Sequence, residues 1–147
     1  MALTDVNRLI QTAITSVDAD NGAYCGYLLA MRGRTDTYIQ KTQSQLDLPC
    51  LVQYIEYKEE TLRNGERLRE MEFYMFGSIE KKDNNPEAVE EVHEIIDNAI
   101  YEFYRNLQDA GLRPAFVGKR ERLVEQIAAV YDAGIFFTLT LTLDAKC

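Results

Sequence analysis

The last stretch of the chain alternates apolar residues with threonine almost to its end. Between Phe137 and Leu143 every odd position is apolar and every even position is threonine. Successive side chains of a β-strand point to opposite faces of a sheet, so this spacing predicts a half-buried strand with one face against a core. None of these side chains is a reactive group. The chain must therefore build a sheet that this strand joins.

The pair Asn64-Gly65 predicts a β-hairpin in the middle of the chain. It readily adopts the positive φ angles of a two-residue type I′ turn, and the flanking segments 51–62 and 67–79 have the composition of strands. Alternation in the second arm predicts a core-facing strand whose inner residues are Met71, Phe73 and Met75. The outer residues are Glu70, Glu72 and Tyr74. The tip, residues 59–69, carries charges of both signs and is expected to project into solvent or against a partner.

A first helix is predicted near the N-terminus, where Thr4 can cap it and residues 18–22 stop it. Its apolar face repeats with the period of an amphipathic helix and consists of Val6, Leu9, Ile10, Ala13, Ile14 and Val17. The segment that follows is less regular. Residues 24–31 are apolar enough for a short buried strand, and residues 33–45 are expected to form an irregular connection.

A second, long helix is predicted to start at Pro86, with Asn85 as its cap, and to end before Gly111, which suits a left-handed residue after the last turn. It is about 25 residues long, and its apolar stripe is Val89, Val92, Ile96, Ala99, Ile100, Phe103 and Leu107. The interval 86–112 holds seven acidic residues against Arg105 alone. Most of the net negative charge of the chain is therefore expected on one face of this helix.

Residues 119–133 fit either kind of secondary structure. Their apolar positions favour a short helix that ends near Gly134, ahead of the terminal strand. Together these elements predict a single α+β domain over residues 1–147. We expect a mostly antiparallel sheet with a central hairpin, flanked by an N-terminal helix and a long acidic helix.

Charge and cysteine content limit the classes of function. The net charge of −8 disfavours tight binding of nucleic acid, because that affinity comes mostly from basic residues at phosphates. The three cysteines have neither the number nor the spacing of a disulfide framework or a zinc site, which indicates a reducing compartment. We expect neither secretion nor a membrane span, because no apolar run has the length that either requires.

One pair of residues has the spacing of metal ligands. Glu90 and His93 form an E-x-x-H pair on the long helix, but a di-metal site needs a second such pair, and His93 is the only histidine. Residues 18–22 are similar to the start of a calcium loop, yet Leu29 stands where a glutamate ligand is required. A serine or cysteine nucleophile also lacks a base in reach. We therefore expect no catalytic residue, metal or cofactor.

Basic residues gather in two segments away from the acidic helix. One holds Arg32, Arg34 and Lys41, and the other holds Arg113, Lys119, Arg120 and Arg122. Two interpretations stay open. The charges are either scattered on a solvated surface or complementary to the acidic helix of a neighbouring subunit.

A Gly33-Arg34 turn precedes a strand over residues 49–57 that begins with proline. The segment 132–147 passes from Asp-Ala-Gly through an aromatic strand to a final cysteine. With these motifs, the order of the predicted elements resembles that of the tail-terminator, or tail-completion, proteins of tailed bacteriophages. The resemblance spans most of the chain.

This resemblance implies a non-enzymatic structural protein of the virion, assembled in the cytoplasm of the bacterial host. Such proteins form rings, here a hexamer or a dodecamer, that contact the tail tube or connector proteins while DNA passes through the lumen as cargo. An acidic wall repels phosphate and lets DNA slide. The candidate lumen residues are Glu90, Glu94 and Asp97.

The resemblance also makes the hairpin tip and the terminal strand candidate interfaces, the strand through edge pairing with a neighbour. The residues concerned are Arg63, Asn64, Gly65, Glu66, Leu139 and Leu141. Two alternatives stay open. A neck or ring adaptor, the head–tail connector of the same virion, predicts a twelvefold ring. A small non-viral regulatory domain or enzyme predicts a monomer or dimer with a ligand pocket.

Overall fold

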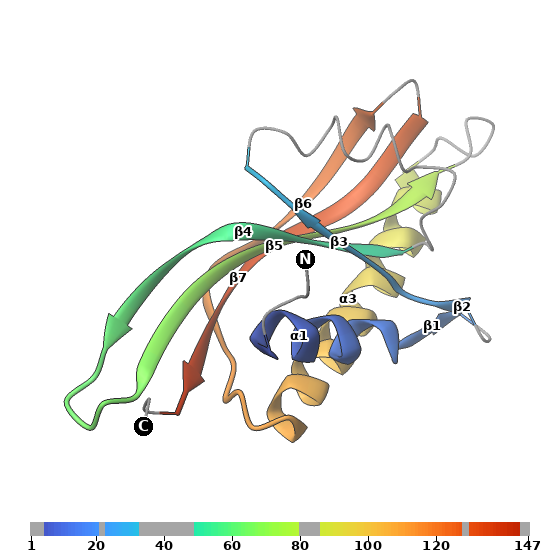
Figure 1. The fold of residues 1–147 in the computed structure, drawn as a ribbon. Helices are drawn as coiled ribbons and strands as arrows, with labels where there is room; N and C mark the ends of the chain where they lie inside the picture. The colour runs from blue at the N-terminus through green and yellow to red at the C-terminus, as the bar shows by residue number, and fades with distance from the viewer. Residues whose placement is uncertain (1–4, 21–22, 33–48, 80–85, 128–129, 145–147) are drawn as a thin grey trace.

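The computed structural model describes residues 5–20, 23–32, 49–79, 86–127 and 130–144. Within these ranges, two helices and seven strands follow one another (Figure 1). In order they are α1 (Asp5–Thr15), β1 (Asp18–Asp20), β2 (Ala23–Tyr24), β3 (Gly26–Ala30), β4 (Cys50–Thr61), β5 (Arg67–Ile79), α3 (Pro86–Asp109), β6 (Ala115–Ile127) and β7 (Val130–Leu143). The segment 33–45, predicted as an irregular connection, lies outside the described residues.

Five strands form one sheet in the order β3-β4-β5-β7-β6, and β1 pairs separately with β2. Only β3 and β4 run parallel, while the other three neighbouring pairs are antiparallel. Both helices lie on one face of this strongly curved sheet (Figure 1). The prediction of an α+β fold with a mostly antiparallel sheet, a central hairpin and two flanking helices is therefore confirmed.

The terminal strand is confirmed, and its place in the sheet is central. Strand β7 pairs with β5 along its length, from Leu143 opposite Arg67 to Tyr131 opposite Ile79, and with β6 on its other side. Phe137, Leu139 and Leu141 are completely buried, whereas the threonines between them are half-buried. The alternation of the sequence is thus an alternation between the two faces of the sheet.

The helix favoured over residues 119–133 is wrong, because residues 119–127 and 130–133 are strand. Strand β6 continues to Ile127 and β7 begins at Val130. Leu123 packs on the sheet face opposite the helices, while its neighbour Arg122 reaches the helix side. Apolar residues at these positions satisfy a period of two as well as a helical one, and pairing with β7 decides between them.

The main core fills the space between the helices and the sheet. Phe73 of β5 stacks on Phe137 of β7 with ring centroids 5.3 Å apart, and Phe103 of α3 meets Phe73 edge-on at 5.7 Å. From α1, Ile10, Ala13 and Ile14 join this core, but Leu9 is 40% exposed and lies outside the face predicted for it. The aromatic contacts hold the long helix across the middle of the sheet.

The opposite face of the sheet carries a second apolar cluster. Its buried members are Ala30, Cys50, Val52, Tyr74 and Phe76. Tyr74, predicted on the outer face of β5, stacks on Phe76 at 5.9 Å, so this face is apolar at this end. Toward the hairpin the same face becomes polar, with Glu70 and Glu72 half-buried.

No helix within the described ranges is both long and apolar enough to cross a membrane.

Candidate functional site

The β4–β5 hairpin extends beyond the helices as an arm, which we define as residues 55–69 (Figure 1). The hairpin is confirmed, but the expected two-residue type I′ turn is wrong. The amide of Gly65 donates to the carbonyl of Leu62 at 2.9 Å, and the amide of Leu62 donates to the carbonyl of Glu66 at 2.7 Å. Gly65 has a φ of 84° and Asn64 does not have a positive φ. The turn therefore contains one left-handed residue, with three residues between Leu62 and Glu66.

An ion-pair cluster stiffens the helix-side face of the arm. The guanidinium of Arg69 lies 4.0 Å from the ring centroid of Tyr57, and its Nη2 is 3.0 Å from Glu59 Oε2. Arg67 approaches the other oxygen of the same carboxylate at 3.9 Å. Arg69 is only 8% exposed, so its charge is held by this stack and this carboxylate.

The tip of the arm is tied to the loop between α3 and β6. Arg113 in that loop forms an ion pair with Glu66, which also accepts a hydrogen bond from the side-chain amide of Asn64. The hydrogen bond from Arg113 holds the pKa of the Glu66 carboxyl below its ordinary value. Arg113 has a φ of 46°, an uncommon conformation for a residue with a side chain. Of the predicted tip residues, Arg63 and Asn64 are exposed and Gly65 and Glu66 are half-buried.

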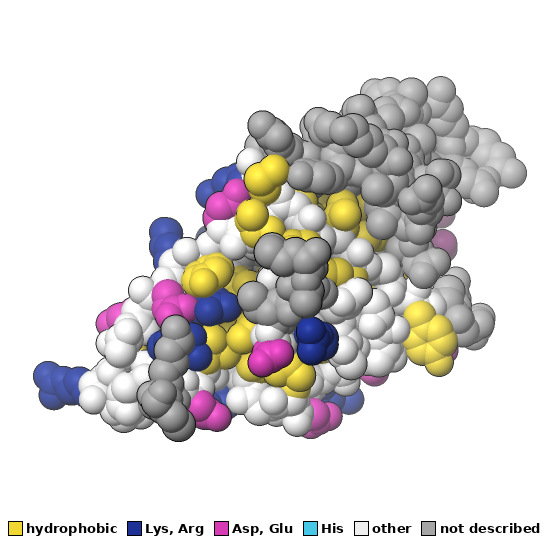
Figure 2. All heavy atoms as spheres, viewed as in Figure 1, with side chains coloured by type: hydrophobic (Ala, Val, Ile, Leu, Met, Phe, Trp, Pro, Cys, Tyr) yellow, Lys and Arg dark blue, Asp and Glu magenta, His cyan; other side chains and the backbone are white. Residues whose placement is uncertain are grey.

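Half of β4 has an open edge. Strand β3 pairs with β4 only from Cys50 to Tyr54, and within the described residues no strand pairs with the outer edge of β4 beyond that point. Residues 55–61 are all exposed, including Ile55 at 41% and Tyr57 at 48%. Figure 2 shows charges of both signs along the arm, with apolar side chains between them. Open strand edges with exposed apolar residues are sites of strand addition.

The terminal strand does not form such an edge. Leu139 and Leu141, predicted as interface residues, are completely buried under the helices, and β7 has a paired strand on each side. The expectation of edge pairing through this strand is therefore wrong. An apolar alternation at the end of a chain predicts a strand but does not say whether that strand is central or lateral.

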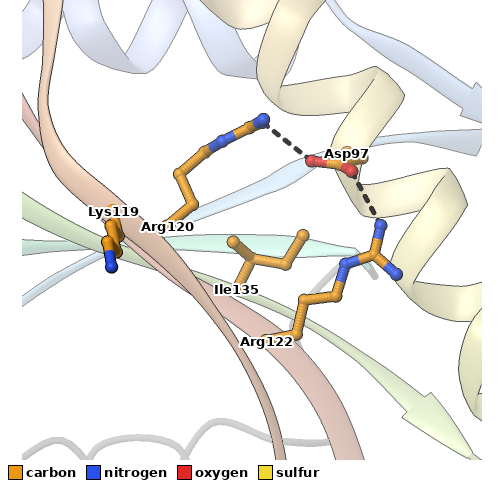
Figure 3. A pocket seen from close by; sticks show the side chains of 5 residues that line it. All are labelled: Asp97, Lys119, Arg120, Arg122 and Ile135. Carbon is orange, nitrogen blue, oxygen red and sulfur yellow. Dashed lines mark hydrogen bonds and ion pairs between the residues drawn. The ribbon is translucent and has the colours of Figure 1, made fainter.

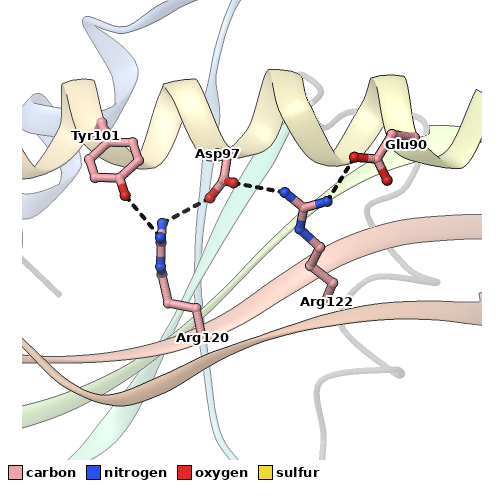
Figure 4. Close-up of polar contacts among 5 residues, drawn as sticks. All are labelled: Glu90, Asp97, Tyr101, Arg120 and Arg122. Atoms are coloured by element: carbon pink, nitrogen blue, oxygen red, sulfur yellow. Dashed lines mark hydrogen bonds and ion pairs between the residues drawn. The ribbon is translucent and has the colours of Figure 1, made fainter.

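A second polar cluster joins α3 to β6 (Figure 4). Asp97 accepts hydrogen bonds from Arg120 at 2.8 Å and from Arg122 at 3.0 Å, through different carboxylate oxygens. Arg122 also donates to Glu90 at 3.1 Å, and Arg120 to the hydroxyl of Tyr101 at 2.9 Å. Two basic residues predicted to face an acidic helix thus do so within one chain.

A pocket of about 380 Å³ opens beside this cluster, lined by Asp97, Lys119, Arg120, Arg122 and Ile135 (Figure 3). Hydrogen bonds to Glu90 and Asp97 raise the pKa of the Arg122 guanidinium, which stays charged in any case. Two of the three basic side chains that line the pocket, Arg120 and Arg122, form ion pairs with carboxylates of α3. This cluster therefore fixes α3 against β6. Among the described residues, Lys119 has no ion-pair partner within the chain.

The predicted lumen residues do not share one environment. Glu90 and Asp97 belong to the cluster with Arg120 and Arg122, whereas Glu94 is exposed apart from it. Other exposed acids at helical spacing around Glu94 are Glu87, Glu91 and Glu102. The solvent side of α3 therefore carries an acidic stripe, and α3 is the helix that the sequence predicted to be acidic.

His93, the histidine of the E-x-x-H pair, is buried and only 5% exposed. Its Nε2 lies 3.0 Å from the carbonyl oxygen of Leu123, an edge contact between α3 and β6. Within the described ranges no three histidine, cysteine or acidic side chains gather as metal ligands. Burial raises the pKa of the Cys25 thiol to about 12, and the charge of Asp18 adds to this, so Cys25 stays protonated.

No model of a known protein family matches this chain, and a search of curated proteins finds no match either.

Proposed function

We propose that the chain is a ring-forming structural protein of a tailed-phage virion, at the tail end or the head–tail junction. The observation that carries the proposal is the arm, a strand pair that leaves the body of the domain and whose β4 edge over residues 55–61 is paired with none of the described strands. Such an edge in a stable domain is typical of a protein that completes its sheet with a neighbour. The helix, the hairpin, the long helix and the terminal strand on which the phage resemblance rests follow one another in that order, with β6 as an additional strand before the last one.

The internal contacts of the arm support this function. Arg69 is held between Tyr57 and Glu59, and Glu66 at the tip is tied to Arg113. An arm that is ordered before assembly loses less conformational entropy when it docks. A free loop of the same length would have to be ordered by the neighbour.

The channel of the ring is lined by the exposed acidic stripe of α3, which comprises Glu87, Glu91, Glu94 and Glu102. Glu90 and Asp97 are left out of this wall, because Arg122 and Arg120 balance their charges. A wall of unpaired carboxylates repels phosphate and favours the passage of DNA over its retention. The protein performs no chemistry in this role.

The test is the native mass of the purified protein, by light scattering or mass photometry, over a range of protein and salt concentrations. A discrete hexamer is expected, because head-to-tail interfaces that close give rings of defined number. A dodecamer would favour the adaptor position at the connector. A strict monomer or dimer at every concentration would contradict the proposal, and stabilisation by a small ligand would then favour a regulatory domain.

A further inference from the structure

The charge of Arg67 is poorly compensated within the chain. Arg67 lies on the helix-side face of the arm, opposite Thr61 of β4 and Leu143 of β7. Its side chain is only 20% exposed, and its Nη1 is 3.9 Å from Glu59, whose other oxygen is 3.0 Å from Arg69. The Nε of Arg67 is buried and, within the described residues, has no hydrogen-bond partner. Two guanidinium groups thus share one carboxylate.

The two arginines differ in how this carboxylate serves them. Arg69 approaches one oxygen of Glu59 through both Nε and Nη2, at 3.1 and 3.0 Å, and its guanidinium stacks on Tyr57. The 3.9 Å contact of Arg67 is too long for a hydrogen bond. A guanidinium that is largely removed from water needs a hydrogen-bonded carboxylate to offset its lost hydration. Arg67 therefore has room for a second carboxylate, which its planar fork of donors can bind with two parallel hydrogen bonds.

We propose that a carboxylate of a second copy of the chain binds Arg67, at an interface between the arm of one subunit and its neighbour. This contact belongs to the ring proposed above, on which the inference rests. Charge favours another copy as the partner, because the chain has a net charge of −8. Exposed acids outside the stripe of α3 that have no ion-pair partner among the described residues include Glu60, Asp109 and Glu121.

An acid of the same chain is the alternative partner. Asp144 directly follows Leu143, which lies opposite Arg67. It is exposed, however, and lies near enough to Arg113 for their charges to interact. The two possibilities differ in the role of Arg67. A partner in the same chain would make Arg67 a contributor to folding stability, whereas a partner in a second copy makes it a contributor to assembly alone.

Arg67→Met separates folding from assembly. Chemical denaturation at protein concentrations below assembly should show a variant at least as stable as the unmodified chain, because an apolar side chain replaces a poorly compensated charge. Mass photometry should show the concentration of half-assembly raised about tenfold. Arg105→Met, which removes an exposed arginine of α3, should change neither quantity. A clear loss of folding stability in Arg67→Met would show that Arg67 is paired within its own chain and would overturn the proposal.

Carbodiimide coupling identifies the carboxylate. In Arg67→Lys the new amine can form an amide bond with a carboxylate that touches it. A mixture of isotope-labelled and unlabelled chains distinguishes bonds between copies from bonds within one chain. Mass spectrometry should find position 67 joined to an acid of the other copy, and Arg105→Lys should give no such product at position 105. Coupling of position 67 only to acids of its own chain, such as Glu59, would overturn the proposal.

The outcomes separate this inference from the function on which it rests. A ring whose half-assembly concentration is unchanged in Arg67→Met would overturn the contact and leave the ring proposal standing. Stabilisation of the dilute chain by inorganic phosphate, lost in Arg67→Met while assembly is unchanged, would assign Arg67 to a free oxyanion and also overturn the contact. A monomer at all concentrations, measured on the unmodified chain, would overturn both the contact and the ring.

Discussion

The phenol ring of Tyr74 on β5 lies directly over the backbone of Gly134 on β7. A methyl group added at Gly134 would come within 3.0 Å of three atoms of that phenol. An aromatic side chain that covers a glycine on the neighbouring strand fills the space left by the missing side chain and shields the backbone there. The two residues are thus one packing unit of the sheet.

Replacing Gly134 with alanine should therefore destabilise the fold by about 1–3 kcal/mol through overpacking. Chemical denaturation measures this change. In the double variant Gly134→Ala/Tyr74→Ala, the total loss of folding stability should be smaller than the sum of the losses in the two single variants, because contacting residues are coupled. Gly77→Ala serves as control, since its methyl would meet only side-chain atoms of Val92 and Ile96, the nearer at 3.1 Å. Additive losses at Gly134 and Tyr74 would contradict the packing argument.

Replacing Arg69 with methionine should loosen the arm. The change removes the stack on Tyr57 and leaves Glu59 with Arg67 alone, for a cost of about 1–2 kcal/mol. Hydrogen exchange of the amides in residues 55–69 should accelerate more than exchange in α3. Lys58→Met, at a side chain that is 89% exposed, should leave exchange unchanged. Equal acceleration throughout the domain would mean that Arg69 supports the whole fold and not the arm.

Acid should release the tie between the tip and the α3–β6 loop. The folded-state pKa of Glu66 lies below its ordinary value of 4.5, so its contribution to stability is complete above that value and is lost as the pH falls through the folded-state pKa. An NMR titration of the Glu66 carboxyl measures this pKa. In Arg113→Gln the pKa of Glu66 should rise toward the ordinary value. An unchanged pKa would show that Asn64 alone holds the carboxylate.

Asp97 and Glu94 allow an acidic residue within an ion-pair cluster to be compared with one that faces solvent. Asp97→Asn weakens the hydrogen bonds to Arg120 and Arg122 and should cost about 1 kcal/mol of folding stability. Glu94→Gln is the matched control on the same helix and should change stability little. Thermal unfolding at low and high salt distinguishes the two, since the cost at Asp97 should shrink as salt screens the ion pairs.

The acidic stripe makes a separate prediction about DNA. Changing Glu87, Glu91 and Glu94 together to lysine should leave the ring mass unchanged and create binding of double-stranded DNA that weakens steeply with salt. Lysines at Asp5, Asp109 and Asp144, exposed residues outside the stripe, give the same change in net charge and form the control. Equal DNA binding by both triple variants would count against a channel at this face.

Much of the fold follows from local patterns in the sequence. The apolar alternation of Phe137 to Leu143, the hairpin around Gly65 and the long helix from Pro86 all stand in the structure. Each is set by periodicity or by turn chemistry within a few residues, so one sequence is sufficient to detect it. The polar part of the candidate interface at Arg63 and Asn64 was found in the same way.

The remaining features depend on residues distant in sequence. Leu123 and Val124 fit a helix by spacing, and only pairing with β7 makes them strand. Leu139 and Leu141 were predicted on a strand at the sheet edge, but β6 lies on the outer side of β7 and forms that edge. Arg120 and Arg122 were interpreted either as solvated charges or as complementary to a neighbouring subunit, yet the fold brings them to Asp97 of their own chain. Strand order and ion-pair partners are tertiary properties, and a single sequence contains no direct signal for either.

Because β7 lies inside the sheet and comes last among its strands, the position of β7 determines when the sheet can form during synthesis. Strands β5 and β6 leave the ribosome first, but they do not pair with each other and stay separated until β7 enters between them. The sheet is therefore completed only after residues 130–143 have been translated and have left the exit tunnel. Until then the nascent chain exposes the inner faces of β5 and α3, which makes this interval the period of greatest need for a chaperone.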